Sequence, residues 1–116
     1  MDLLTTHEQR DGWTVLHVHG EVDLTTVPRL RGQLADLLRD HGPHLIVDLD
    51  DVGLLDSAGL GVLLGAVRRA RSADGEVRFV STRPPVQRLF AVTGLDAIHP
   101  LADSVETAVA RGRREG

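Results

Sequence analysis

The chain has 116 residues, a formal net charge of −4 and no cysteine. This length suits one domain with its own core, so we treat residues 1–116 as a single domain. The absence of cysteine excludes disulfides, thiol catalysis and thiolate metal sites, and the mild acidity disfavours nucleic acid as the main partner. All 13 basic residues are arginine, and a chain without lysine forms neither a Walker A loop nor a Schiff base. Because no apolar run approaches the ~20 residues of a membrane helix and the N-terminus lacks a signal-peptide pattern, we expect a cytoplasmic protein without membrane association.

The N-terminal third of the chain predicts a β-hairpin and then a helix. Residues 3–8 and 13–19 are typical of strands, and the Asp11-Gly12 pair between them is a strong turn signal. Residues 20–26 read as a polar link, after which Pro28 and the threonines before it mark a helix start. The apolar face of this helix consists of Val27, Leu30, Leu34, Leu37 and Leu38, and residues 40–43 end it.

The remainder of the chain alternates strands and helices, which implies a mostly parallel sheet. We therefore expect an α/β fold with an N-terminal β-hairpin, a mostly parallel mixed sheet and about four helices. A short apolar run at 45–49 is typical of a strand buried on both faces. The other expected elements are a helix from Ser57 to about 72–75, a strand at 77–80, a helix from Pro84 to Val92 ended by Gly94, a short strand at 97–99, a final helix capped by Asp103 or Ser104, and a frayed tail from about 111.

Ser57 lies at the corner between the buried strand and the helix that follows it. Serine is a preferred N-cap, so we place Ser57 at that position. The corner lies at the carboxyl end of a strand, where open α/β sheets usually carry their sites. Ser57 is therefore either a helix cap alone or a functional hydroxyl. The apolar face of the helix consists of Leu60, Leu63, Leu64 and Val67.

Two further features of this helix favour a functional reading. Gly59, Gly61 and Gly65 each cost roughly 1 kcal/mol relative to alanine inside a helix, so a packing or contact reason is expected. Gly61 and Gly65 share one face and leave a shallow surface that another backbone could approach. A phosphate on Ser57 would add about −1.5 to −2 charge beside Asp56, at the positive end of the helix dipole. Such a change would alter the surface with little refolding.

Enzymatic motifs fail on particular residues. A nucleophile elbow requires glycine where the chain has Leu55, and the glycines of the helix have the wrong spacing for a dinucleotide fingerprint. A phosphoryl-accepting receiver site would need a lysine on a late strand beside its acidic residues. His17 and His19 share a strand face, but no third metal ligand is indicated. We expect no enzymatic activity, no cofactor and no metal site. The acidic residues considered for a receiver site are Asp48, Asp50, Asp51 and Asp56.

Arg68, Arg69 and Arg71 form a basic patch at the end of the same helix, where positive charge suits the helix dipole. The patch is either a solvated face or a contact for an acidic partner, and the sequence leaves both readings open.

The run Leu55-Asp56-Ser57-Ala58-Gly59-Leu60-Gly61, preceded by Gly20-Glu21-Val22-Asp23, resembles the STAS domains. In length the chain is similar to free-standing anti-sigma factor antagonists. The resemblance implies a partner-switching regulator that binds an anti-sigma factor which is also a serine kinase, and thereby frees a sigma factor. Phosphorylation at the position of Ser57 releases this partner, and a serine phosphatase restores the unmodified form.

The resemblance also implies a surface for the phosphosite and the partner, made by Asp23, Asp56, Ala58, Gly59 and Gly61 around Ser57. Ala58 departs from the family, because many members carry a second hydroxyl there, and Ser57 is thus the only candidate hydroxyl of the motif. Two alternatives stay open. One is a STAS scaffold or regulatory subunit of a transporter or stress-sensing complex, and the other is a small domain that binds a nucleotide phosphate at the helix N-terminus.

Overall fold

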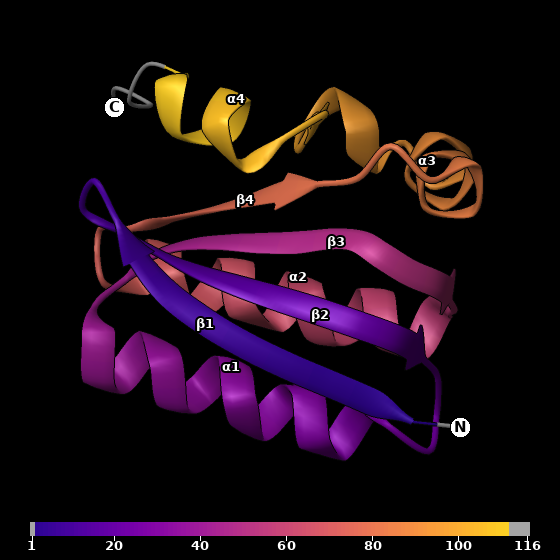
Figure 1. The fold of residues 1–116 in the computed structure, drawn as a ribbon, viewed down its shortest axis with the longest axis horizontal. Helices are drawn as coiled ribbons and strands as arrows, with labels where there is room; N and C mark the ends of the chain where they lie inside the picture. Colours follow the sequence, from indigo (N-terminus) through magenta and orange to yellow (C-terminus); the bar gives the residue numbers. More distant parts are fainter. Residues whose placement is uncertain (1, 112–116) are drawn as a thin grey trace.

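The computed structural model describes residues 2–111 and shows a five-stranded sheet with helices on both faces (Figure 1). The expected α/β fold with a mixed sheet and four α-helices is confirmed. The elements are β1 (Leu3–Arg10), β2 (Trp13–Val22), α1 (Val27–His41), β3 (His44–Leu55), α2 (Ser57–Ser72), β4 (Glu76–Val80), α3 (Pro84–Val92), the 3-10 helix η1 (Leu95–Ala97), β5 (Leu101–Ala102) and α4 (Val105–Ala110).

The strands lie in the order β1-β2-β3-β4-β5. The first pair is antiparallel and the other three pairs are parallel. Asp11 and Gly12 join the first pair with φ angles of 52° and 85°, which is the left-handed backbone that favours a tight hairpin turn. The predicted hairpin and mostly parallel sheet are therefore both present.

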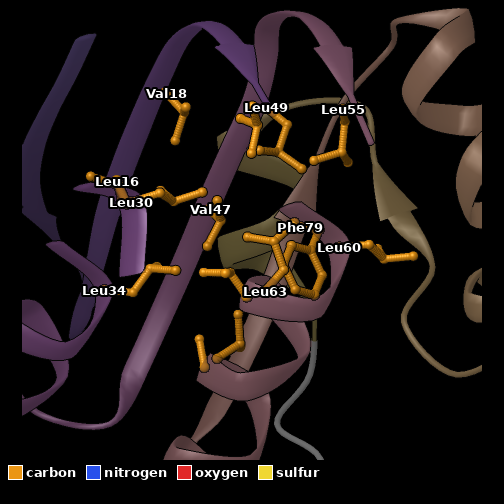
Figure 2. Close-up of a cluster of buried hydrophobic side chains, with 14 of the residues drawn as sticks. Leu16, Val18, Leu30, Leu34, Val47, Leu49, Leu55, Leu60, Leu63 and Phe79 are labelled. Carbon is orange, nitrogen blue, oxygen red and sulfur yellow. The ribbon is translucent and has the colours of Figure 1, made fainter. Parts of the chain in front are cut away.

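The main core lies between the sheet and the helices α1, α2 and α3. Leu16 and Val18 of β2 point to this side, and Figure 2 shows Leu16 near Leu30 of α1. A smaller cluster occupies the other face, where Trp13 and Val15 pack with residues of α4. The central strands are buried on both sides, which explains why β3 begins with a continuous apolar run.

Three predicted strands end later than expected. β1 continues to Arg10, although the sequence suggested an end at residue 8. β2 continues to Val22 and β3 to Leu55, although the sequence suggested a polar link from residue 20 and a strand of 45–49. The aspartates within β3 interrupt its apolar pattern, so the sequence predicted a shorter strand. The register between β2 and β3 also shifts twice, between His17 and His19 and between Gly20 and Glu21, so no simple alternation runs along β3.

The strand predicted at 97–99 is wrong. Gly94 has a left-handed backbone, with φ of 73°, and the chain turns from it into the 3-10 helix η1. The last strand is β5, which begins two residues after the predicted strand ends, and its Leu101 and Ala102 pair with the end of β4. Ser104 caps α4 by accepting a hydrogen bond from the backbone N–H of Thr107, at 3.0 Å.

The expected frayed tail falls mainly on residues 112–116, which lie outside the described residues. Among residues 2–111, no helix has the length and apolar character that a membrane span requires.

Candidate functional site

The candidate site lies where the parallel strands β2 and β3 end side by side. Val22 pairs with Leu55, and the backbone N–H of Asp56 donates to the carbonyl of Val22 at 3.2 Å. Asp23 directly follows the first of these paired residues and Asp56 directly follows the second. The sheet therefore brings together two segments that the motif pattern had linked only by their order in the chain.

Asp56, and not Ser57, is the N-cap of α2. Asp56 has an extended backbone, and its Oδ1 accepts a hydrogen bond from the N–H of Gly59 at 3.0 Å. The prediction that Ser57 is the N-cap is wrong. Aspartate and serine cap helices about equally well, and because β3 ends at Leu55, the residue between the strand and the first helical turn is Asp56. Ser57 is instead the first helical residue, and its side chain is exposed.

The hydroxyl of Ser57 is not needed to cap the helix. Within residues 2–111 its Oγ makes no hydrogen bond, since Asp56 performs the capping. The backbone N–H groups of Ser57 and Ala58, at the positive end of α2, likewise have no acceptor within this part of the chain. The arrangement presents a free hydroxyl beside two unsatisfied donors, which is a chemically suitable place for an added anion.

Asp23 supplies fixed negative charge at the same edge. Its Oδ1 accepts from the hydroxyl and the N–H of Thr25, at 2.6 and 2.9 Å, and from the N–H of Thr26 at 3.2 Å. The hydrogen bond from the Thr25 hydroxyl is the main reason why the pKa of Asp23 lies below its usual value. Asp23 is thus held by its own loop as a carboxylate, and no bond joins it to Ser57 in the described structure.

The glycines of α2 have different environments. A Cβ on Gly59 would lie 2.5 Å from Cγ1 of Val22 and 2.7 Å from Cδ1 of Leu55, so a larger residue there would force these side chains to shift. A Cβ on Gly61 would meet nothing within 4 Å. Gly59 is therefore buried beneath the site, whereas Gly61 is exposed and lies one helical turn after Ser57.

Two exposed leucines flank the site and were missed in the sequence. Leu24, in the loop after Asp23, is 76% exposed, and Leu54, just before the junction, is 44% exposed. Their signal was present, because Leu24 is an apolar residue inside a polar loop and Leu54 is out of phase with the buried Leu55. Together they add apolar surface to a rim that otherwise carries carboxylates, as protein-docking surfaces commonly do.

The histidines considered as metal ligands are bound to carboxylates on the face of the sheet away from α1 and α2. Nδ1 of His17 lies 2.8 Å from Asp48 Oδ2, and Nε2 lies 2.7 Å from Glu8 Oε2. Arg10 bridges Glu8 and Glu106 of α4 at 2.9 and 3.1 Å. We call Glu8, Arg10, His17, Asp48 and Glu106 the sheet-face cluster.

Protonation of His17 is favoured by this cluster. Burial lowers the pKa of His17, but the hydrogen bonds to Glu8 and Asp48 outweigh burial and raise the pKa above its usual value. Among the other acidic residues of β3, Asp50 accepts from the N–H and the hydroxyl of Thr82, both at 2.7 Å, and these bonds lower its pKa. The acidic residues of β3 thus tie strands and loops together.

Comparison with known proteins identifies the family to which the chain belongs. The family model described as the STAS domain matches residues 5–108, and the chain belongs to this family. The resemblance noted from the two sequence motifs is thereby confirmed.

Individual relatives of known name or structure are described more specifically than the family model is. An anti-sigma F factor antagonist of Paenibacillus polymyxa is 31% identical over 110 residues, with 94% of each chain covered. An anti-sigma-B factor antagonist of Staphylococcus aureus is 32% identical over 100 residues, covering 85% of this chain and 93% of the relative. A crystal structure of an anti-sigma factor antagonist from Mycobacterium paratuberculosis superposes with a TM-score of 0.84 at 32% identity, covering 95% of this chain and 96% of that one.

Proposed function

We propose that this chain is an anti-sigma factor antagonist that switches partners through phosphorylation of Ser57. The unmodified chain binds an anti-sigma factor that is also a serine kinase, and a sigma factor is freed. Phosphorylation of Ser57 releases the partner, and a serine phosphatase resets the cycle. The chain itself acts as a binding protein and substrate, not as an enzyme, and ATP with Mg²⁺ belongs to the kinase.

The observation that carries this proposal is the free hydroxyl of Ser57. Because Asp56 caps α2, the Ser57 oxygen has no internal task and stands exposed at the start of the helix. A kinase can therefore modify it without unfolding the helix start. Ala58 offers no second hydroxyl, so the motif has one acceptor.

Charge and bulk explain how the modification would release a partner. A phosphate adds about −1.5 to −2 charge to a surface that already carries the carboxylates of Asp23 and Asp56. The unsatisfied N–H groups of the first turn stabilise the phosphate in the free chain. A partner docked there would instead have to bury it, and each 1.4 kcal/mol of lost interface energy weakens binding about tenfold. The fold of the chain need not change.

The test is incubation of the chain with each recombinant anti-sigma factor kinase of the source organism and ATP, followed by intact mass and mapping of the modified peptide. We expect one added phosphate, located on Ser57, and none on Ser57→Ala. Modification of another residue, or of none by any of these kinases, would contradict the proposal.

Two substitutions at Ser57 test the switch itself. We expect Ser57→Ala to bind the kinase as the unmodified chain does, and Ser57→Asp to bind at least about tenfold more weakly, because it adds a negative charge at the contact. Isothermal titration measures both affinities. A complex of fixed stoichiometry that responds neither to ATP nor to Ser57→Asp would indicate a permanent scaffold or regulatory subunit instead. Melting of the chain that shifts with nucleotide alone would indicate a nucleotide-binding domain.

A further inference from the structure

A groove of about 260 Å³ runs between α1 and α2, beside the exposed side of α2. Its floor is made of small and aliphatic residues, and arginines from both helices stand along it. We call it the arginine groove. It is lined by Arg31, Leu34, Gly61, Val62, Gly65, Ala66, Arg68 and Arg69.

The arginines of this groove are not used within the chain. Arg31, Arg68 and Arg69 are exposed, and within residues 2–111 none of them forms an ion pair or a side-chain hydrogen bond. Arg10 and Arg39, by contrast, pair with carboxylates at 2.9 to 3.1 Å. Arg29, Arg71 and Arg88 are also exposed and unpaired within residues 2–111, but none of them lines the groove. Three unpaired guanidinium groups on one groove of a chain with a net charge of −4 form a local positive surface that attracts carboxylates.

The glycines of the groove have no packing function in the described structure. A Cβ on Gly61 would meet nothing within 4 Å, and one on Gly65 would meet only Nη2 of Arg68, at 3.9 Å. Each glycine nevertheless weakens the helix relative to alanine. What the glycines provide is bare backbone between the arginines, over which an incoming chain can approach closely.

The groove is continuous with the candidate site. Ser57, Gly61 and Gly65 follow one another at intervals of four residues, so they share the exposed side of α2. At 1.5 Å per residue, Arg68 lies about 16 Å along the helix axis from Ser57, within the footprint of one protein partner. A protein that covers Ser57 therefore reaches the groove without a second interface.

We propose that the arginine groove docks an acidic segment of the same protein that contacts Ser57, with Asp or Glu side chains paired to Arg31, Arg68 and Arg69 and the segment's backbone lying over Gly61 and Gly65. The inference rests on the proposed function and adds the chemistry of the partner. Guanidinium groups bind carboxylates through paired hydrogen bonds, which fixes the direction of the docked segment. Arg68 lies further from Ser57 along the helix than the roughly 8 Å screening length at physiological salt, so this end of the groove remains attractive when Ser57 is phosphorylated.

A peptide titration tests the groove without any kinase. The probe is a ten-residue peptide of alternating Asp and Glu, with an Asn and Gln peptide of the same length as its neutral control, and the readout is the amide spectrum of ¹⁵N-labelled chain. We expect the acidic peptide to shift the amides of Gly61 and Gly65, with an effect that fades at high salt. The neutral peptide should shift neither. Shifts confined to other surfaces, or no shift, would overturn the proposal.

Charge reversal supplies matched variants for this titration. We expect Arg68→Glu/Arg69→Glu to abolish the shifts, and Arg31→Glu on the other helix to weaken them. Arg71→Glu is the control, because Arg71 is an exposed arginine of the same helix end that does not line the groove. Melting curves verify that each variant is folded. Equal shifts in the double variant and the wild type would overturn the proposal.

Two other occupants give distinct results. If inorganic phosphate shifts the same amides at the concentration at which the peptide does, the groove is a simple anion site and the proposal is wrong. If dilution of the chain alone shifts them and the mass by light scattering is that of a dimer, the occupant is a second copy, which also overturns the proposal.

The kinase that phosphorylates Ser57 provides the decisive comparison. We expect Arg68→Glu/Arg69→Glu to bind this kinase at least about tenfold more weakly than Arg71→Glu does, while saturating kinase still modifies Ser57. Equal affinities with normal Ser57 phosphorylation would overturn the groove proposal alone. Absence of Ser57 phosphorylation in the wild type would overturn the proposed function, and the peptide titration would still decide the groove.

Discussion

The exposed side of α2 and the sheet-face cluster both carry charged groups, but only the cluster pairs its charges within the chain. In the sheet-face cluster, His17 bonds to the carboxylates of Glu8 and Asp48, and Arg10 pairs with Glu106 and with the same Glu8. On α2, the Ser57 hydroxyl and the guanidinium groups of Arg68 and Arg69 have no partner among residues 2–111. Charges satisfied internally hold the structure together, whereas unsatisfied ones are available to another molecule. Gly59 and Asp56 of α2 likewise make their contacts within the chain, so we count them with the residues that hold the structure together.

This comparison predicts that variants of the inner side of α2 change stability, variants of its outer side change docking, and variants of the sheet-face cluster change how stability depends on pH. Four substitutions test it, each by a different mechanism.

Gly59→Ala should have the largest effect on stability. Its methyl group would overlap Val22 and Leu55, and overpacking a core typically costs 1–3 kcal/mol, of which the better helix propensity of alanine offsets about 1. We expect a net loss of up to about 2 kcal/mol in the free energy of unfolding, measured by urea denaturation. A higher stability would show that the core beneath the site is loose.

Asp56→Ala should cost about 1 kcal/mol, because the N–H of Gly59 loses its capping acceptor. Asp56→Asn is the matched control, since asparagine caps a helix without the charge and should keep most of the stability. The same denaturation experiment measures both. If the two variants lose equal stability, the charge of Asp56 is what matters, and its role as a hydrogen-bonding cap is contradicted.

Gly61→Ala should raise stability by about 0.5–1 kcal/mol, because the added methyl group meets open space and alanine favours the helix. The same variant should weaken binding to the kinase, since it covers the backbone that a partner approaches. Melting temperature and titration measure the two properties. A stabilised variant that binds normally would remove Gly61 from the docking surface.

The smallest effect is expected from the sheet-face cluster. Because the pKa of His17 is raised in the folded chain, the stability it contributes is fully present below the unfolded pKa of about 6.5 and is lost as pH rises through the higher folded pKa. We expect the wild type to lose its stability advantage over His17→Gln across this range, while affinity for the kinase does not depend on the substitution. A constant difference in stability would contradict the ion pairing seen here.

Features set by residues close together in the sequence could be predicted from it, whereas features set by contacts between distant segments could not. The hairpin followed from Asp11-Gly12 and the buried face of α2 from its leucine spacing, because both patterns are local. The motif also placed the candidate site at the start of α2, which stays a prediction. By contrast, the choice of Asp56 over Ser57 as the cap depends on where β3 ends, and that is determined by pairing with β2.

Other features required contacts between distant segments. The different roles of Gly59 and Gly61 appear only once Val22 and Leu55 are placed beneath the helix. Arg31 joins the arginines of α2 because two helices lie side by side, and no spacing in the sequence connects them. The short strand β5 is defined by its pairing with β4 more than by its own residues.

The central claim is that one exposed hydroxyl controls docking, and the most direct measurement compares two forms of the same chain. The chain phosphorylated only on Ser57, prepared with the kinase and purified, is titrated beside the unmodified chain against that kinase without nucleotide. We predict at least about tenfold weaker binding of the phosphorylated form, with amide shifts confined to the neighbourhood of Ser57. Equal affinity of the two forms would contradict the account.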